Sequence, residues 1–326
     1  MKTKEAQKAK ETGSMLSEVQ GQSEGVQVLR RVVEGRIRTP LLLVGPEGVG
    51  RRFSVVEAAR EAFSKGDEKS PHSKRISQGI HPDLVVFRPP DGKDFGVDAM
   101  REVAQLAESY PSTVPVRYVV IDSADSMTIP AANALLKTLE EQPPTTRFFL
   151  LVGSPEAVLP TIRSRCGVVR YKPLPEDFVV KYVSALTDNP AKALVCTRLG
   201  EGSVGLAYQF LASGRLTLRN KVVRMLEACV EKDFSSAFSL VDEVEGDLDY
   251  GLRFLDHVLT DIAMLPHAPD KISNVDIPEK ILSLKDRMGS KTSELVLGFR
   301  GLQGKMRSNA LLPFHLKTLF ASTFSR

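Results

Sequence analysis

Over the first half of the chain, short runs of aliphatic and β-branched residues alternate with amphipathic segments. The runs that predict strands are residues 41–44, 84–87, 118–121 and 148–152. Between the last two runs, residues 129–141 repeat apolar side chains at the spacing of one helix face. Strands that are apolar on both sides and alternate with helices are typical of a buried parallel sheet. We therefore expect an α/β domain in this half.

The strand pattern stops after Pro173 and Pro175. Residues 176–212 predict short helices, and from about Leu216 apolar residues recur at helical spacing to the end of the chain. The expected organisation is a polar N-terminal tail (1–18), an α/β core (19–172), a small helical domain (173–212) and a larger all-helical domain (213–326).

Composition adds limits to this picture. With 326 residues, 42% of them hydrophobic and 26% charged, the chain has the size and balance of a globular protein of two or three domains. No apolar run approaches the roughly 18 residues that span a bilayer, so we expect no membrane partner. Three scattered cysteines cannot form a disulfide framework, which favours a reducing, cytoplasmic location. The net charge of +4 is too small to argue for nucleic acid by itself.

A glycine-rich segment follows the first predicted strand and precedes a helical pattern. It runs Gly45-Pro46-Glu47-Gly48-Val49-Gly50-Arg51-Arg52. Its frame matches the phosphate-binding loop Gly-x-x-x-x-Gly-Lys-Ser/Thr. In such a loop, glycines let backbone N–H groups curl around phosphates, and the helix N-terminus adds its dipole.

Two positions of this loop depart from the pattern. Arg51 stands where lysine contacts the β- and γ-phosphates, and Arg52 replaces the hydroxyl that ligates Mg²⁺. Arginine stays protonated and offers no lone pair to a metal ion. We therefore expect the loop to keep its shape but to lack its metal chemistry.

The third predicted strand is followed by Asp122 and Ser123. An aspartate at this place is where a nucleotide-bound Mg²⁺ is usually held, and the next residue is normally the glutamate that orients water. The Ser123 hydroxyl is too weak a base for that task at neutral pH. Asp122 has a second interpretation, as a retained scaffold acid that caps a helix.

Three further segments carry a family resemblance. They are Val19-Gln20-Gly21-Gln22, Asn133-Ala134-Leu135-Leu136-Lys137-Thr138-Leu139-Glu140-Glu141-Gln142-Pro143-Pro144, and Ser164-Arg165-Cys166. In combination they resemble the AAA+ clamp-loader subunits of replicative DNA polymerases over about residues 18–212. The resemblance implies an AAA+ parallel-sheet core with a degenerate loop, then a small helical lid domain (173–212) and a C-terminal helical collar for oligomerisation (213–326).

The resemblance also assigns a role to Arg165. In that family, the arginine of Ser-Arg-Cys is a finger that enters the ATP site of the neighbouring subunit. A guanidinium suits this task because it is planar, permanently charged and bidentate toward phosphate oxygens. The alternative is that Arg163 and Arg165 only make surface ion pairs. Cys166 fits a packing role better than a redox role.

The sequence differs from the pattern of this family in two more ways. Gly205 occupies the place of the sensor arginine found in ATP-hydrolysing subunits of the family. Bacterial members often hold zinc with four cysteines, but residues 53–120 contain none. His72 and His81 alone cannot complete a tetrahedral site, so we expect no zinc and no cofactor bound by this chain.

The resemblance therefore implies a non-hydrolysing subunit of the bacterial DNA polymerase III clamp loader. Its expected partners are a gamma/tau-like ATPase subunit that binds ATP, a delta-like subunit, the sliding clamp and primed DNA. Two alternatives stay open. One is an active clamp-loader ATPase in which Arg51 replaces the lysine, and the other is a DNA-binding adaptor whose basic patch is Arg30, Arg31, Arg36 and Arg38.

Overall fold

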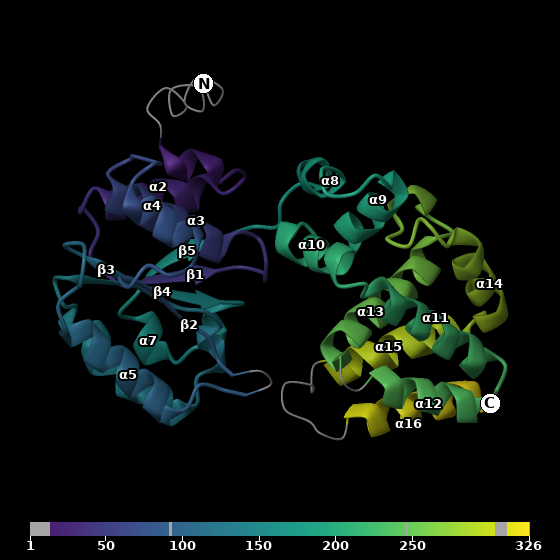
Figure 1. Ribbon diagram of the computed structural model, residues 1–326. Helices are drawn as coiled ribbons and strands as arrows, with labels where there is room; N and C mark the ends of the chain where they lie inside the picture. Colours follow the sequence, from purple (N-terminus) through teal and green to yellow (C-terminus); the bar gives the residue numbers. More distant parts are fainter. Residues whose placement is uncertain (1–13, 91–92, 245–246, 304–311, 326) are drawn as a thin grey trace. The chain divides into compact units, whose positions relative to one another are not determined.

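The computed structural model describes residues 14–90, 93–244, 247–303 and 312–325 (Figure 1). They form two compact units, the first ending at Leu174 and the second beginning at Pro175. Each unit is described by itself. Residues 1–13, which make up most of the expected N-terminal tail, lie outside the described residues.

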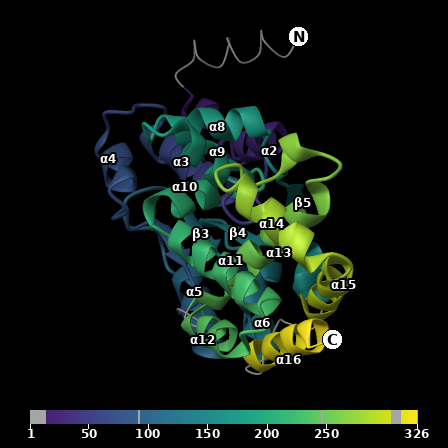
Figure 2. The ribbon, with the colours of Figure 1, turned by 90° about the vertical axis from the view of Figure 1, so that its right-hand side faces the viewer.

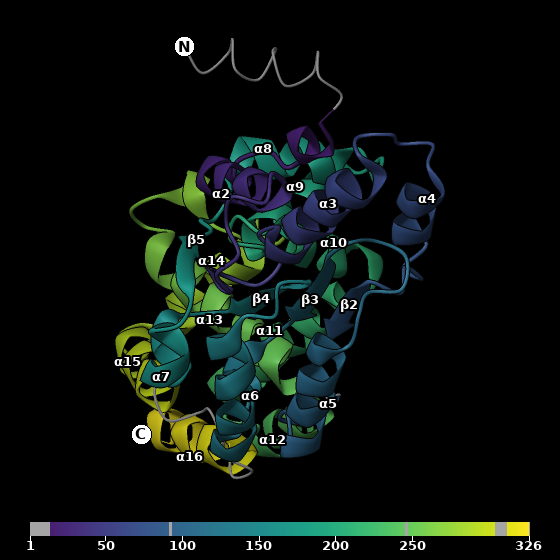
Figure 3. The ribbon, with the colours of Figure 1, turned by 90° about the vertical axis from the view of Figure 1, so that its left-hand side faces the viewer.

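The first unit contains a five-stranded, fully parallel sheet in the order β2-β3-β4-β1-β5 (Figures 1 and 3). Its strands are β1 (Leu41–Val44), β2 (Leu84–Phe87), β3 (Arg117–Ile121), β4 (Thr146–Val152) and β5 (Gly167–Arg170). The four predicted strands and the α/β class are confirmed. The sequence pattern missed β5, because this edge strand offers only two consecutive apolar residues, Val168 and Val169.

Helices cover both faces of this sheet. They are α2 (Ser23–Val33), α3 (Arg51–Ser64), α4 (Pro71–Ser77), α5 (Val97–Glu108), α6 (Ile129–Glu141) and α7 (Pro160–Arg163), with the short 3-10 helices η2 (Ala124–Ser126) and η3 (Pro155–Ala157). Successive strand residues point to opposite faces. Leu43 joins the core that includes residues of α2 and α3, and Leu42 joins the core that includes residues of α5 and α6.

The chain before α2 contributes to the core, which corrects the boundary of the expected tail. Residues Met15–Glu18 form the 3-10 helix η1, and the side chains of Met15 and Leu16 are fully buried. The Glu61 carboxylate on α3 accepts hydrogen bonds from the Ser14 hydroxyl (2.6 Å) and the Leu16 backbone N–H (3.0 Å). A polar tail to residue 18 was therefore too long, since residues 14–18 pack on α3.

The second unit is helical throughout its described residues (Figures 1 and 2). Its helices are α8 (Glu176–Ser184), α9 (Pro190–Leu199), α10 (Val204–Ala212), α11 (Leu216–Val230), α12 (Phe234–Val244), α13 (Leu248–Met264), α14 (Pro278–Met288), α15 (Lys291–Gln303) and α16 (Leu312–Phe324), with the 3-10 helix η5 (Pro269–Lys271). α8, α9 and α10 pack on one another, and α11 packs on α12 and α13. None of the helices within the described ranges has the length and hydropathy of a bilayer-spanning segment.

Two arginines, one of them buried, join the helices of this unit to the loop before α14. Arg219 on α11 is almost fully buried and donates to both carboxylate oxygens of Asp276, at 2.7 and 2.8 Å. Arg198 on α9 donates to the backbone carbonyl of Ile272 at 2.7 Å. The unit thus holds both segments that the sequence assigns to a lid and a collar, and the boundary between them at 212/213 stays a prediction.

Candidate functional site

The glycine-rich loop lies at the carboxyl edge of the sheet, between β1 and α3. A Cβ atom on Gly45 would come within 2.4 Å of the backbone oxygen of Tyr171, so only glycine fits this close approach. Gly50 precedes α3 with a left-handed φ of 102°, which favours glycine. Gly48 is also left-handed, with a φ of 72°. The loop therefore has the glycine-dependent shape that its sequence predicts.

Arg51, which stands in the place of the lysine, contacts the protein's own backbone. Its Nη1 donates to the carbonyl of Val152, the last residue of β4. Burial lowers the pKa of the Arg51 guanidinium from its ordinary value, and the nearby carboxylates of Asp122 and Asp125 oppose that shift. The side chain is thus tied to the neighbouring strand.

Asp122 follows β3 and is paired with two arginines. Its Oδ2 lies 2.9 Å from Nη1 of Arg52 and 3.5 Å from Nε of Arg88. Strand register explains the second pair, because Phe87 lies opposite Ile121 and the next residue of each strand follows at the same edge. The carboxylate faces guanidinium groups instead of capping the helix that follows it, whose N-cap is Ser123.

Ser123 and Asp125, which follow Asp122 in this segment, are also held by hydrogen bonds that involve the backbone. Ser123 has a left-handed φ of 62°, and its carbonyl accepts hydrogen bonds from the N–H and hydroxyl of Ser126. The Oδ2 atom of Asp125 accepts a hydrogen bond from the N–H of Gly153 at 3.1 Å. The segment after β3 is therefore held to the end of β4.

Gln22 fixes the loop from the other side. Its buried amide donates to the carbonyls of Val49 (3.1 Å) and Lys172 (2.8 Å), and its oxygen accepts from the Lys172 N–H (3.2 Å). Beneath the loop, the hydroxyls of Ser54 and Tyr171 share a buried hydrogen bond of 2.6 Å, and burial raises the pKa of Tyr171 to about 12. These contacts join the loop to β5.

Arg165 lies at the opposite, amino edge of the same sheet, just before β5. Its Nη1 donates to the Thr161 carbonyl at 3.0 Å, and its Nη2 lies 3.3 Å from Oε2 of Glu140 on α6. Its Nε is buried and has no hydrogen-bond partner among the described residues. The guanidinium borders an open, mainly polar hollow of about 580 Å³, lined by Thr39, Glu140, Gln142, Ser164, Arg165, Cys166 and Gly167.

The structure brings the loop residues together but keeps Arg165 apart from them. β1 and β5 are parallel neighbours, with Leu41 opposite Gly167 and Val44 opposite Arg170. Arg165 precedes one strand, whereas the loop follows the other. A strand of four residues spans about 13 Å. The two candidate sites thus lie at opposite edges of the sheet.

Two other residues singled out from the sequence lie elsewhere. Gly205 is the second residue of α10 in the second unit, where the Ser203 hydroxyl caps the helix by accepting from the Leu206 N–H (3.0 Å). Cys166 is partly buried, and burial raises the pKa of its thiol to about 12. That shift keeps the thiol protonated, as expected for a packing role.

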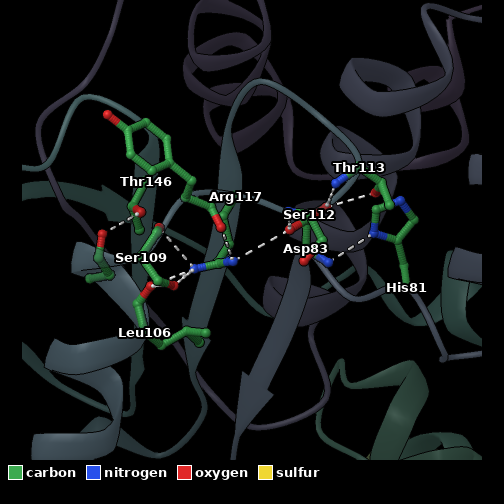
Figure 4. Close-up of polar contacts among 10 residues, drawn as sticks. His81, Asp83, Leu106, Ser109, Ser112, Thr113, Arg117 and Thr146 are labelled. Atoms are coloured by element: carbon green, nitrogen blue, oxygen red, sulfur yellow. Dashed lines mark hydrogen bonds and ion pairs between the residues drawn. The ribbon is translucent and has the colours of Figure 1, made fainter.

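The segment before β2 holds a buried, hydrogen-bonded charge pair (Figure 4). Asp83 is fully buried and accepts hydrogen bonds of 2.7 Å from the N–H of Ser112 and from the N–H and hydroxyl of Thr113. Its carboxylate lies 3.5 Å from Arg117, the first residue of β3. Burial alone would raise the pKa of Asp83, but these donors and Arg117 hold it below its ordinary value.

The two histidines considered for a metal lie beside this pair. His72 Nδ1 and His81 Nε2 are 3.0 Å apart, and His81 Nδ1 accepts from the Asp83 N–H at 3.1 Å. Within the described ranges, no group of three or more His, Cys, Asp or Glu side chains is arranged to hold a metal ion. The expectation that the chain binds no zinc stays a prediction.

Sequence reasoning missed three partners of the candidate residues. Arg88 follows a predicted strand, so the rule that parallel strands share their carboxyl edge could have found it. Glu140 and Gln22 belong to the segments that carry the family resemblance, but the sequence alone indicated no contact between either of them and a candidate residue. Their contacts join segments far apart in sequence, and no local signal announces them.

The fold and the loop together place the chain in a recognisable class. A parallel sheet in this order, with a glycine loop between the first strand and a helix, is an AAA+-type core. The family model described as DNA polymerase III, delta subunit, matches residues 21–175. DNA polymerase III subunit delta' of Escherichia coli strain K12 is 32% identical over 226 residues, covering 68% of this chain and 67% of that protein. The chain belongs to this family of clamp-loader subunits.

The chain is also similar to other known proteins. DNA polymerase III subunit delta' of Haemophilus influenzae is 29% identical over 206 residues, covering 61% of this chain and 62% of that protein. Replication factor C subunit 3 of Saccharomyces cerevisiae is 28% identical over 218 residues, covering 63% of this chain and 58% of that protein. A gamma subunit-related DNA polymerase III protein of Thermotoga maritima, of known structure, aligns over 92% of this chain and 98% of its own, with a TM-score of 0.47 and 19% identity.

Proposed function

We propose that this chain is a clamp-loader subunit that does not hydrolyse ATP itself and that supplies Arg165 to the nucleotide site of a neighbouring ATPase subunit. The observation that carries the proposal is the position of Arg165 at the sheet edge opposite the chain's own loop. A side chain there cannot reach a nucleotide in that loop. The phosphates that it contacts would belong to another molecule.

The state of the chain's own loop supports the first half of the proposal. Arg51 donates to the Val152 carbonyl, and Arg52 and Arg88 both face Asp122. Hydrolysis of ATP needs Mg²⁺ between the β- and γ-phosphates and a residue that orients water. A divalent cation beside Asp122 would meet the positive charges of two guanidinium groups, and Ser123 replaces the residue that activates water.

The setting of Arg165 supports the second half. Its side chain is partly exposed and borders an open hollow. A planar, permanently charged guanidinium suits bidentate contact with phosphate oxygens. An arginine finger is worth about 10³ to 10⁵ in the rate of phosphoryl transfer.

Membership of the family supports heteromeric partners. We propose a gamma/tau-like ATPase subunit with an intact lysine loop, a delta-like subunit, the sliding clamp and primed DNA. ATP would be bound by the ATPase subunits. Residues 213–326 would act as the oligomerisation collar through their packed helices, and residues 173–212 would be the lid.

The two alternatives receive less support. An active ATPase would need Arg51 to leave the Val152 carbonyl and contact phosphates. In the proposed basic patch, Arg36 already pairs with Glu34 at 3.2 Å, and Arg30 and Arg31 lie in the last turn of α2, where the helix dipole favours cations.

The experiment is a reconstitution of the full chain with its clamp-loader partners, followed by measurement of DNA-stimulated ATP hydrolysis. We expect Arg165→Ala to lower the rate by about 10³-fold. Arg163→Ala is the matched control, since it removes a nearby exposed arginine, and it should stay within about twofold of wild type. Normal turnover by the Arg165→Ala complex would overturn the finger assignment. Mg²⁺-dependent hydrolysis by the isolated chain would instead favour the active ATPase.

A further inference from the structure

We propose that Glu140 is a positioning residue for Arg165. Its carboxylate orients the Arg165 guanidinium toward the hollow until a phosphate replaces that carboxylate. This inference rests on the proposed finger role. It adds a second residue to the site, one whose own side chain does not touch the nucleotide.

Two anchors define the orientation of the guanidinium. Nη1 donates to the carbonyl of Thr161 on α7, and Nη2 lies 3.3 Å from the Glu140 carboxylate on α6. α6 and α7 pack on one another, so both anchors belong to one rigid part of the fold. An arginine side chain that lost one anchor would sample several rotamers about its long stem. Glu140 therefore restricts where the charge is presented.

The ion pair between Arg165 and Glu140 is exposed enough for a ligand to break it. The side chains of Arg165 and Glu140 are 31% and 64% exposed, and exposed ion pairs are weak. Glu140 also lines the hollow beside Arg165, so an entering phosphate meets the same guanidinium. A phosphate carries more charge and more acceptor oxygens than one carboxylate, and it can displace Glu140 from Nη2.

The neighbouring Glu141 offers a matched control. It has the same charge on the same helix and is similarly exposed, at 56%. Successive helix residues project about 100° apart. Glu141 accordingly pairs with Lys137 at 3.7 Å, one turn earlier on α6, and not with the finger.

The test measures kcat and KM for ATP in the reconstituted complex with full-length chains. We expect Glu140→Ala to lower kcat about two- to fivefold with a smaller change in KM, because a weak orienting contact is lost. Glu140→Gln should restore most of kcat, since its amide oxygen still accepts from Nη2. Glu141→Ala should match wild type, and Glu140→Ala should add nothing in the Arg165→Ala background.

The outcomes separate this inference from the finger itself. If Arg165→Ala abolishes hydrolysis and Glu140→Ala matches wild type, the positioning role is wrong and the finger stands. If Glu140→Ala lowers kcat equally with and without Arg165, its effect is structural and the inference is also wrong. If Arg165→Ala is silent, the proposed function itself fails. Glu140 is exposed, so its variants should fold, and Glu140→Gln preserves side-chain volume as a second check.

Discussion

The two edges of the sheet in the first unit both carry arginine–carboxylate pairs, but they differ in how many arginines surround each carboxylate. At the carboxyl edge, Asp122 lies between Arg52 and Arg88, at the place where a nucleotide-bound metal would be expected. At the amino edge, Arg165 shares one exposed contact with Glu140. The same chemical groups thus place two cations around one carboxylate at one edge and leave one arginine beside an open hollow at the other.

A third arginine–carboxylate pair in this unit is buried. Asp83 and Arg117 also lie where strands begin, but both side chains are almost completely buried and hydrogen-bonded (Figure 4). A buried pair cannot be opened by a ligand without the cost of an uncompensated charge. Solvent access, more than residue type, separates the pair that serves the fold from the one we assign to catalysis.

The largest expected loss of stability comes from breaking that buried pair. Asp83→Ala should lower the free energy of unfolding by about 3 to 5 kcal/mol, because Arg117 would be left buried and unpaired. Urea denaturation followed by circular dichroism measures it. The control is Asp98→Ala, which breaks the exposed pair of Asp98 with Arg101 and should cost less than about 1 kcal/mol. Equal losses in the two variants would contradict the contrast.

Asp83 should also impose an acid dependence on stability. Its folded-state pKa lies below its ordinary value of 3.8, so its contribution is complete above about pH 4 to 5. The contribution is lost as the pH falls from there through the folded-state pKa. Melting temperatures between pH 6 and pH 3 should therefore fall more steeply for wild type than for Asp83→Asn. Parallel profiles would mean that another carboxylate dominates acid unfolding.

A smaller effect is expected at the glycine loop of the carboxyl edge. Gly45→Ala should cost about 2 to 3 kcal/mol, because its Cβ would meet the Tyr171 backbone oxygen at 2.4 Å. Gly50→Ala is strained by its positive φ but meets no atom within 4 Å, and it should cost about 1 kcal/mol. Denaturant midpoints give both values. If Gly45→Ala lowers the free energy of unfolding by less than the expected amount, the loop relaxes away from β5.

The smallest effect is expected where arginines surround Asp122. The side chains of Arg52 and Asp122 are 47% and 19% exposed, so Arg52→Ala should cost at most about 1 kcal/mol, and less in high salt. In the reconstituted complex it should leave ATP hydrolysis within about twofold of wild type, unlike Arg165→Ala. A large loss of turnover from Arg52→Ala would show that this edge still acts on nucleotide.

Local pattern was enough to predict much of the fold. Residues 41–44 and 129–141 match β1 and α6 to the residue, because the first is an uninterrupted apolar run and the second repeats apolar residues on one helix face. β5 carries only Val168 and Val169 between a glycine and an arginine, and its pairing with β1 makes it a strand. The buried Met15 and Leu16 were likewise read as tail, since their partners on α3 lie about 45 residues away.

Residue identity alone carries the prediction about the loop's chemistry: the arginines at 51 and 52 offer no lone pair to a metal ion, and the hydroxyl of Ser123 is a weak base at neutral pH. Only the tertiary structure decided which groups meet. The pairing of Arg88 with Asp122 comes from strand register, and the separation of Arg165 from the loop comes from the parallel direction of β5. Register and strand order depend on contacts between distant segments, which no local pattern encodes.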